Sequence, residues 1–429
     1  MAREMKNSGI EWIGNIPAHW EMKRLKSLFL ERKEKNDPVK TDFILSLGAS
    51  YGVVPYSEKE GGGNKAKEDL TDYRLAYPND IVMNSMNIIS GSVGISRYFG
   101  CVSPVYYMLY PRQDNVDPDF YCYLFQTKAF QKSLLGLGNG ILMKESSNGT
   151  FNTVRMRIPM EKLGVQPIPM PSLKEQKKIA SYLNIKCAEI DDVIKKTEAT
   201  IEEYKSLKRV LIAEKVSKGL SENSDMKDSG VEWIGDIPAH WKVRKGKWIL
   251  SRLERPVQED DGVITCFRDG EVTLRSKRRE EGFTFSLQEV GYQGIEQGDL
   301  VVHGMDGFAG AIGISDSRGK GTPVLNVLDS TENKKYIMYY LRNMAYNGIF
   351  LALSTGIRVR SCDTNWNKLK ELPYLVPSLE EQKEISDYLD KKCDEIDALI
   401  SAKTALLEEL ETYKKSVIYE YTTGKKEVC

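Results

Sequence analysis

The sequence lacks the short motifs through which many enzymes hold phosphates or metals. No G-x-x-x-x-G-K-[ST] loop is present, because Gly319-Lys320 is followed by Gly321 and the upstream spacing is wrong. No H-E-x-x-H or paired C-x-x-C motif occurs either. The chain has no Pro-Pro pair, which excludes the Asn/Asp-Pro-Pro-aromatic signature of amino-methyltransferases. These absences argue against a catalytic chain, and we expect no cofactor and no bound metal.

Cysteine and long apolar runs are scarce. The 7 cysteines, at positions 101, 122, 187, 266, 362, 393 and 429, are odd in number and scattered, so a disulfide framework is not expected. A reduced, cytoplasmic setting fits this usage best. No run of ~18 apolar residues is present to span a membrane, and the first residues lead into no apolar stretch of a signal peptide. We expect a cytoplasmic protein without membrane contact.

An excess of charge of one sign is also missing. Lys and Arg total 61, Asp and Glu total 61, and the net charge is +0. This balance excludes a uniformly basic coat for nucleic acid but allows local basic patches. At 429 residues the chain is long for one hydrophobic core, so two or more domains are expected.

What the chain does contain is a second copy of its own plan. Residues 8–20, Ser-Gly-Ile-Glu-Trp-Ile-Gly-Asn-Ile-Pro-Ala-His-Trp, return almost unchanged as residues 229–241. Each copy is termed the tryptophan motif. Later landmarks keep their spacing too, since residues 79–82 (Asn-Asp-Ile-Val) are matched by 298–301 (Gly-Asp-Leu-Val), and 94–96 by 313–315. A repeat of this length indicates a duplicated architecture.

Each tryptophan motif leads into a mixed region with signals for strands and helices. Short β-rich runs bounded by glycine are typical of strands, and they occur at Phe43–Leu47, Ile81–Met83, Val105–Tyr110, Val263–Phe267 and Leu300–Val302. Helices are expected at Tyr121–Leu135 and Lys335–Leu353. Around the shared landmarks the two regions diverge, and Gly61-Gly62-Gly63 is expected to be a mobile loop. Each region is predicted to be a compact α+β globe.

A long charged helix is expected after each globe. Ser172 with Glu175, and Ser378 with Glu381, form capping boxes at the two starts. The helices then continue without proline or glycine to Gly219 and Gly424, where a left-handed residue ends a helix readily. About 45 residues correspond to a rod of roughly 68 Å, which is too long for the core of one domain. The helices are therefore predicted to be spacers.

Apolar residues in both helices recur at alternating intervals of three and four, as in a coiled coil. The expected seam comprises Leu183, Cys187, Ile190, Ile194, Thr197, Ile201, Tyr204 and Leu211 in the first helix, and Leu389, Cys393, Ile396, Ile400, Leu407, Leu410 and Val417 in the second. For two similar half-units, the simplest pairing is antiparallel about a pseudo-two-fold axis. The fold class predicted is α+β, with two similar globes joined by an antiparallel coiled coil.

The domain boundaries expected from this plan are near Pro171, Gly219 and Pro377. Residues 1–170 form the first globe with its tryptophan motif, and residues 171–220 form the first spacer helix. Residues 221–376 form the second globe, residues 377–424 the second spacer helix, and residues 425–429 a tail.

The histidines allow two interpretations. His19 and His240 occupy equivalent places, so a catalytic pair is conceivable. Each nevertheless lies in a tryptophan-rich packing segment beside proline. The simpler hypothesis is that the tryptophans Trp12, Trp20, Trp233 and Trp241 dock each globe onto a helix end, with the histidine hydrogen-bonded there. His303 stands alone and is expected to be structural or close to DNA.

Basic residues in the globes are candidates for contact with DNA, because arginine and lysine neutralise phosphates and arginine pairs with guanine. The alternative for each is solvated surface charge. The densest group is Arg275, Lys277, Arg278 and Arg279, followed by Glu280-Glu281. The other candidates are Lys65, Lys67, Arg74, Arg97, Lys144, Arg155 and Arg157 in the first globe, and Arg268, Arg318, Lys320, Arg358 and Arg360 in the second.

Taken together, the sequence resembles the specificity (S) subunits of type I restriction–modification systems. The resemblance covers essentially the whole chain and rests on three features: the tryptophan motif, the Pro-Ser-Leu-x-Glu-Gln-Lys start of both long helices, and the duplicated globe–helix plan. It implies two target recognition domains that read a split site in double-stranded DNA. It also implies that the helices hold two methyltransferase (modification) subunits and, through them, restriction subunits. Methyl transfer and cleavage would then belong to the partners.

Two unlike globes on a stiff rod would read an asymmetric site with a fixed gap. Candidate partner-facing positions near the helix starts are Lys177, Lys178, Ile179, Tyr182, Lys383, Ile385 and Tyr388; solvation of the helix is the alternative. Two other functions stay open, a stand-alone DNA-modifying enzyme (a nuclease or methyltransferase) and a coiled-coil adaptor with no role on DNA. Methyl incorporation by the purified chain would favour the enzyme, and DNA binding without salt dependence would favour the adaptor.

Overall fold

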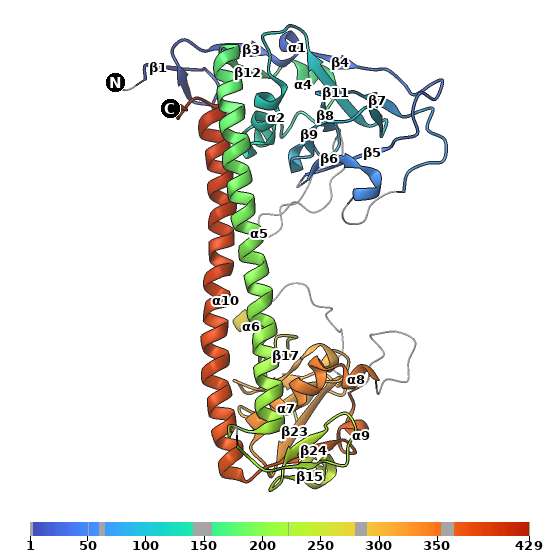
Figure 1. Cartoon of the computed structure of the whole chain (residues 1–429), viewed down its shortest axis with the longest axis vertical. Helices are drawn as coiled ribbons and strands as arrows, with labels where there is room; N and C mark the ends of the chain where they lie inside the picture. Colours follow the sequence, from blue (N-terminus) through green and yellow to red (C-terminus); the bar gives the residue numbers. More distant parts are fainter. Residues whose placement is uncertain are drawn as a thin grey trace. The chain divides into compact units, whose positions relative to one another are not determined.

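The computed structural model describes residues 3–49, 51–59, 65–139, 157–221, 223–278, 290–352 and 364–428. The chain divides into two compact units. Unit 1 consists of Met1–Thr197 with Leu406–Cys429, and unit 2 of Glu198–Ala405. Each unit therefore contains one globe together with half of each long helix (Figure 1).

The first globe is built from antiparallel strand pairs around one four-stranded sheet. The sheet has the order β4 (Phe29–Arg32), β11 (Tyr106–Pro111), β8 (Ile81–Asn84) and β9 (Val93–Ile95). The two-stranded pairs are β1 (Met5–Asn7) with β2 (Asn15–Pro17), β3 (Glu21–Arg24) with β12 (Pro167–Met170), β5 (Leu45–Gly48) with β6 (Gly52–Pro55), and β7 (Arg74–Ala76) with β10 (Gly100–Val102). Its helices are α1 (Leu25–Leu28), α2 (Pro118–Gln126), α3 (Lys128–Ser133) and α4 (Met160–Gly164), with 3₁₀ turns η1 (Tyr56–Glu58) and η2 (Ile88–Ser90).

The second globe repeats this plan strand for strand. Its four-stranded sheet has the order β16 (Leu250–Arg252), β23 (Leu325–Ser330), β20 (Leu300–His303) and β21 (Ile312–Ile314). The pairs are β13 (Met226–Asp228) with β14 (Asp236–Pro238), β15 (Lys242–Lys245) with β24 (Pro373–Val376), β17 (Ile264–Cys266) with β18 (Val272–Leu274), and β19 (Gln293–Ile295) with β22 (Gly319–Gly321). The helices are α6 (Arg275–Arg278), α7 (Lys334–Tyr346), α8 (Ile349–Ala352) and α9 (Trp366–Leu369), with 3₁₀ turns η3 (Gly246–Trp248) and η4 (Gly307–Ala309).

Both faces of each central sheet are buried, which explains why its strands are continuously apolar. On β8, Ile81 and Met83 belong to the larger core of unit 1, whereas Val82 points into a smaller core on the other face. Such alternation follows from the period of two along a strand. The larger core also contains Leu183 of α5 and Val417 of α10. The long helices are thus part of the core of the globe and not only a stalk beneath it.

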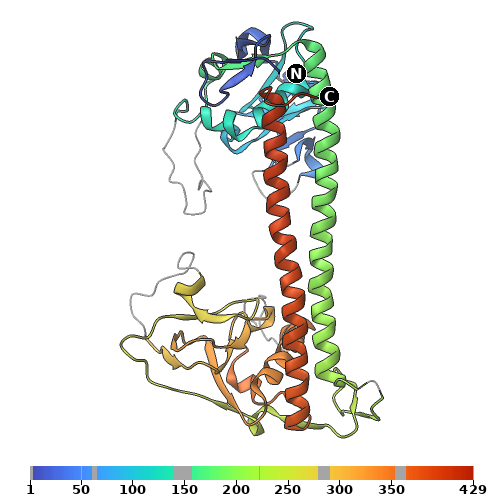
Figure 2. The ribbon, with the colours of Figure 1, turned by 90° about the vertical axis from the view of Figure 1, so that its left-hand side faces the viewer.

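The long helices have the bounds Leu173–Lys218 (α5) and Leu379–Thr422 (α10). Gly219 and Gly424 follow with positive φ angles of 76° and 73°, as expected of glycine at a helix end. In unit 1 the helix halves run antiparallel, since Tyr182 contacts Tyr421 and, further along α5, Asp191 pairs with Lys414 at 2.6 Å. In unit 2, Lys208 pairs with Asp397 at 2.5 Å. Figure 2 shows the two helices from a second side. The predicted α+β fold class with paired antiparallel helices is confirmed.

The seam residues differ in how deeply they are buried. The buried members are Leu183, Cys187, Ile190, Thr197, Ile201, Leu389, Cys393, Ile396 and Val417, and the half-buried ones are Ile194, Tyr204, Leu211, Ile400, Leu407 and Leu410. Near the end of α5 the fully buried positions are instead Ile212 and Val216. There the helix packs against the globe as well as against α10, so its apolar face is wider than a two-helix seam.

Two of the expected helices are each divided into two. Thr127 is extended (φ −69°, ψ 138°) and its hydroxyl accepts from Phe130 N, so it ends α2 and caps α3. In the second globe Gly348, with φ +72°, separates α7 from α8. The expected strand at Phe43–Leu47 begins only at Leu45, and Phe43 is exposed. The triple glycine at 61–63 lies outside the described residues.

Candidate nucleic-acid interface

The tryptophan motif is fixed to the start of α5 by one carboxylate. Glu175 closes the capping box, since its Oε2 accepts from Ser172 N at 3.2 Å and Ser172 Oγ accepts from Glu175 N at 3.3 Å. Its other oxygen, Oε1, accepts from Trp20 Nε1 at 3.3 Å and contacts His19 Nε2 at 2.9 Å and Arg3 Nη2 at 2.5 Å. Trp20 is fully buried. The motif therefore docks the globe onto the helix end.

The same junction recurs in unit 2. Glu381 N donates to Ser378 Oγ at 3.2 Å, and the Glu381 carboxylate accepts from Trp241 Nε1 at 2.9 Å. His240 Nε2 lies 2.9 Å from Glu381 Oε2. Each histidine is thus held by the capping glutamate of its own unit, which favours the docking hypothesis over a catalytic pair.

The tryptophans of the motif do not all share this role. Trp12 is partly buried and packs edge-on against Phe130 with ring centroids 5.7 Å apart. Its counterpart Trp233 is 41% exposed. In unit 1, Tyr419 of α10 also donates to Trp12 O at 2.9 Å. The expectation that Trp233 docks its globe is therefore not met.

The environment of Glu175 lowers its pKa to about 2. Burial alone would raise the pKa, but the hydrogen bonds from His19, Trp20 and Ser172 stabilise the charged form and outweigh it. His303 shows the opposite case, because burial lowers its pKa. Its Nδ1 accepts from Asp306 N at 3.0 Å, so this histidine has the structural role that was one of its two expected roles.

Lys277 and Arg278 of the densest basic cluster have acidic neighbours. Arg278 pairs with Asp269 at 2.6 Å and Glu271 at 2.7 Å, and its guanidinium lies 4.0 Å from the Phe267 ring centroid. Lys277 Nζ lies 3.2 Å from an Asp316 oxygen. These interactions hold α6 to the globe, so the charges of the cluster are not simply presented to solvent.

Four further candidates are bound within their globes. Arg268 pairs with Asp306 at 2.8 Å, Arg318 with Asp261 at 3.0 Å, Arg74 with Glu31 at 3.0 Å and Arg97 with Asp119 at 2.5 Å. Arg275 Nε donates to Thr265 Oγ1 at 2.9 Å. Lys320 is half-buried on β22, whereas Lys65, Lys67 and Arg157 are exposed. The candidates Lys144, Arg155, Arg279, Arg358 and Arg360 lie outside the described residues.

One basic cluster was not expected from the sequence. Lys128 of α3 lies close enough to Lys132 and Lys415 for both to affect it. Burial lowers the pKa of Lys128, and the charges of Lys415 and Lys132 lower it further. Lys415 is distant in sequence, so only the docking of α10 against the globe creates this cluster.

Some of the candidate partner-facing positions on the long helices are buried instead. Ile179 and Ile385 are 5% and 0% exposed and lie in the cores of their units. Tyr182 stacks on Tyr421 with centroids 4.5 Å apart, and Lys178 Nζ donates to Val428 O at 2.7 Å. Tyr388 packs against the core of unit 2. The remaining candidates, Lys177 and Lys383, are exposed.

The described residues contain no metal-binding constellation. No group of three His, Cys, Asp or Glu side chains in this part of the chain is arranged to hold a metal ion. Among the described helices, none is both long and apolar enough to cross a membrane.

Comparison with known proteins adds to this geometry. The profile of the type I restriction modification DNA specificity domain matches residues 17–203. Two relatives come from Methanocaldococcus jannaschii. The proposed type I restriction enzyme MjaX specificity subunit is 22% identical over 437 residues (96% of this chain, 95% of the relative). The type I restriction enzyme MjaVIII specificity subunit is 23% identical over 431 residues (96% and 93%).

Solved structures share the fold over nearly the whole length. A chain from work on complex assembly and conformational transition of the type I R-M system has a TM-score of 0.66 at 15% identity, covering 96% of this chain and 99% of that chain. The HsdS subunit from Thermoanaerobacter tengcongensis has a TM-score of 0.50 at 13% identity, covering 96% and 98%. These likenesses show that the two similar globes on antiparallel helices form a fold found in solved structures of type I systems. Over nearly its whole length the chain is similar to type I restriction enzyme specificity subunits, and residues 17–203 match the type I restriction modification DNA specificity domain.

Proposed function

We propose that this chain is the non-catalytic DNA specificity subunit of a type I restriction–modification complex, with each globe reading one half of an asymmetric, bipartite site. The observation that carries the proposal is that the two globes have the same arrangement of strands but different side chains at equivalent turns. The turn after β9 is Arg97-Tyr98-Phe99, with Tyr98 and Phe99 about two-fifths exposed, whereas the equivalent turn after β21 is Asp316-Ser317-Arg318. Two such globes can read different sequences while being held in the same way.

The candidate base- or phosphate-contacting residues follow from their exposure. Among the described residues, Lys65, Lys67, Arg97 and Arg157 are the exposed candidates of the first globe, and the α6 cluster with Arg268 is the group in the second. An arginine that is already paired with a carboxylate can still contact DNA, but it must exchange one anion for another. Its net contribution to affinity is then smaller than that of a solvated cation.

The helices supply the contacts with methyltransferase subunits and fix the gap between the half-sites. Exposed apolar side chains beside the seam are suitable for this role. Val193 and Tyr413 are 44% and 48% exposed in unit 1, at the level of the Asp191–Lys414 pair. Leu207 and Leu399, 52% and 46% exposed, occupy the corresponding level in unit 2. One such pair in each unit matches two identical partners, and restriction subunits join through them.

In this proposal residues 1–170 and 221–376 form the DNA-reading globes, and residues 171–220 and 377–424 form the spacer helices. Residues 425–429 form a short tail. Methyl transfer and cleavage belong to the partner subunits, which act on DNA in the cytoplasm.

The test is to assay the purified chain and the reconstituted complex with S-adenosylmethionine, and to sequence the methylated sites. Methylation only by the complex, at one bipartite sequence, is the expected result. Methyl incorporation by the chain alone would contradict the non-catalytic role.

A further inference from the structure

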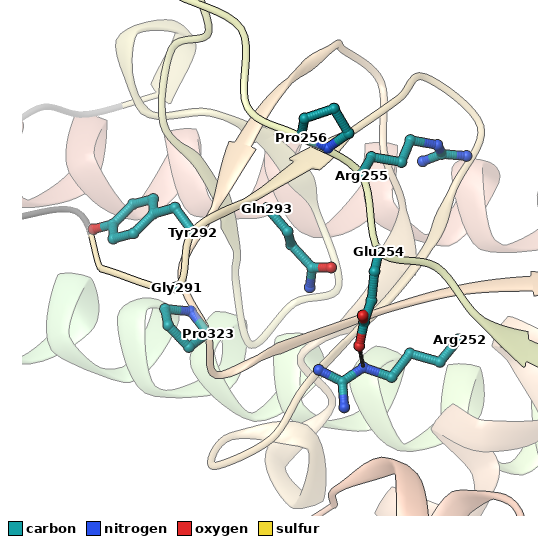
Figure 3. Close-up of a pocket in the computed structure, with 8 residues that line it drawn as sticks. All are labelled: Arg252, Glu254, Arg255, Pro256, Gly291, Tyr292, Gln293 and Pro323. Carbon is teal, nitrogen blue, oxygen red and sulfur yellow. Dashed lines mark ion pairs between the residues drawn. The ribbon is translucent and has the colours of Figure 1, made fainter.

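A polar hollow of about 420 Å³ opens at one edge of the second globe. In Figure 3, Arg252 and Glu254 stand on one side, Tyr292 and Pro323 on the other, and Gln293 points into the space between them. Arg255, Pro256 and Gly291 complete the lining. The hollow is formed by β16 and the residues after it, by the start of β19, and by the residue two before β23.

Strand register identifies the same place in the first globe. Arg252 lies opposite Leu328 in the β16–β23 pair, and Glu31 lies opposite Leu109 in the equivalent β4–β11 pair. Glu31 is therefore the counterpart of Arg252. By the same spacing Lys33 is the counterpart of Glu254.

An equivalent hydrogen bond in the two globes identifies the second wall. Gln293 Nε2 donates to Leu325 O at 2.9 Å, and Arg74 Nη1 donates to Tyr106 O at 3.4 Å. These bonds join equivalent strands, β19 to β23 and β7 to β11. Arg74 is therefore the counterpart of Gln293.

The two globes differ in what occupies this place. In the first globe Arg74 Nη1 reaches Glu31 Oε1 at 3.0 Å, and the two side chains are only 22% and 11% exposed. That ion pair joins the two walls. In the second globe a neutral amide faces a guanidinium, so no such pair forms and the hollow stays open.

The guanidinium in the hollow is held only loosely. Arg252 Nε lies 3.6 Å from Glu254 Oε1, longer than a hydrogen bond, and the two side chains are 43% and 76% exposed. Arg255 behaves differently. It binds Asp299 through two N–H groups, and its guanidinium points away from the hollow (Figure 3). Arg252 is thus the one cation of this lining that is able to change partners.

The frame around the hollow is rigid. Gly294 N donates to Arg255 O at 2.9 Å, and a Cβ on Gly294 would lie only 2.7 Å from Pro256 O. Only glycine therefore lets β19 approach the opposite wall so closely. A preformed hollow loses little entropy when a ligand enters it.

We infer that this hollow seats a backbone phosphate of duplex DNA. Phosphates protrude from a duplex, whereas base edges are recessed in its grooves, so a concave polar site suits the phosphate. Arg, Gln and Tyr side chains are common phosphate contacts, and a guanidinium binds phosphate strongly. Arg252 exchanges Glu254 for the phosphate, with Gln293 and Tyr292 beside it. This inference rests on the proposed function, and it assigns this one phosphate contact to the second globe, with no equivalent at the Arg74–Glu31 pair of the first.

The test uses two substitutions of opposite expected sign in the complex assembled with methyltransferase subunits. Arg252→Ala removes the cation, so duplex binding should weaken about threefold to tenfold at low salt. The slope of log K against log salt should become less steep by about 0.9, the value for one phosphate. Glu254→Gln removes the competing carboxylate, so affinity should rise. Fluorescence anisotropy on a duplex with the methylated sequence, at several salt concentrations, measures both.

The matched control is Lys33→Ala in the first globe, at the position equivalent to Glu254. Lys33 is 74% exposed and lies 3.6 Å from Glu31, and because Arg74 already holds Glu31, the salt slope should not change. Arg252→Lys should keep the slope and so exclude a fold defect. An unchanged slope in Arg252→Ala, or weaker binding in Glu254→Gln, overturns the inference while sequence-specific binding by the wild type still supports the proposed function. Saturable binding of ATP or inorganic phosphate that Arg252→Ala abolishes, with the DNA slope unchanged, would assign the hollow to free phosphate ligands instead.

Discussion

The glutamates at the starts of the two long helices show why the tryptophan motif is repeated almost unchanged. Glu175 caps its own helix and also accepts from Trp20 and His19 of the motif. Glu381 does the same with Trp241 and His240. One carboxylate therefore joins a helix end to a globe, and each partner must keep its donor and its position. Because Glu175 contacts four side chains, few substitutions are compatible with the junction, either in the motif or at the helix start.

The low pKa of Glu175 predicts a pH dependence of stability. A carboxylate whose folded pKa, about 2, lies below its ordinary value of 4.5 stabilises the fold above pH 4.5 and loses that contribution as the pH falls towards 2. Glu175→Gln should lower the free energy of unfolding by about 1 kcal/mol at pH 7 and flatten its decline below pH 4.5. Urea unfolding of the whole chain, followed by tryptophan fluorescence at pH 7 and pH 3, measures this. The exposed Glu161→Gln serves as control; identical pH profiles for both variants would contradict the role of Glu175.

The ion-pair partners of the basic residues could not be predicted from the sequence position by position. The sequence indicated which side chains are charged, but not that Arg318 would meet Asp261, 57 residues away. Ion pairs of this kind depend on tertiary packing, as does the hollow at Arg252. The junction of Trp20 with Glu175 was partly predictable, because both belong to repeated motifs.

Replacing Arg275, Lys277, Arg278 and Arg279 together with alanine should weaken DNA binding and leave partner assembly intact. Since Arg278 and Lys277 already have acidic partners, the expected decrease in affinity is modest, about threefold for each phosphate that the variant no longer neutralises. Filter binding measures affinity, and gel filtration measures assembly. Lys245→Ala with Lys247→Ala, on the same globe and paired with Glu371, is the matched control. Unchanged affinity in the quadruple variant would show that α6 is not part of the DNA interface.

At the scale of elements, the long helices were the most predictable part. Capping boxes at Ser172 and Ser378 and glycines at 219 and 424 fixed their ends to within two residues. The seam was less predictable near the globes. There Ile212 is fully buried and the expected Leu211 only half-buried, because a helix with two neighbours buries a wider face. The break at Thr127 was also missed, although threonine is a good helix cap.

An insertion of four residues between Ile190 and Ile201 should shift the heptad phase and either alter the gap between half-sites or prevent assembly. Ile190 and Ile201 are both buried, and Asp191 pairs across to Lys414, so the seam cannot absorb the shift locally. Sequencing of methylated sites measures the gap. An insertion of seven residues preserves the phase and should assemble. Normal assembly and an unaltered site with the four-residue insertion would count against the spacer role.

At the scale of the whole molecule, the repeat allowed the architecture to be predicted without an accurate assignment of every strand. Two tryptophan motifs and two helix starts imply two globes and two helices, and antiparallel pairing follows from duplication. The repeat could not predict how the surfaces of the two globes differ. That difference lies in side chains such as Phe99 and Arg318, placed on an identical frame, and their interactions depend on neighbours from other strands.

Exchanging residues 221–376 for the corresponding globe of another specificity subunit should change one half-site and leave the other half-site and the gap unchanged. The physical reason is that the core of each globe is completed by both helices, whose seam the exchange leaves intact. Methylated-site sequencing of the hybrid complex is the measurement. A hybrid whose two half-sites both change would show that the globes do not read DNA independently.

The composition of the two units has a consequence for biosynthesis. Unit 2 is one continuous run, Glu198–Ala405, whereas unit 1 needs Leu406–Cys429 to complete a globe that begins at the N-terminus. Val417 and Ile418 are buried in that core. On the ribosome, the first globe to be translated is therefore the last to close. Its apolar surface stays uncovered until residues 406–429 have been translated after unit 2, and chaperones can bind it during that time.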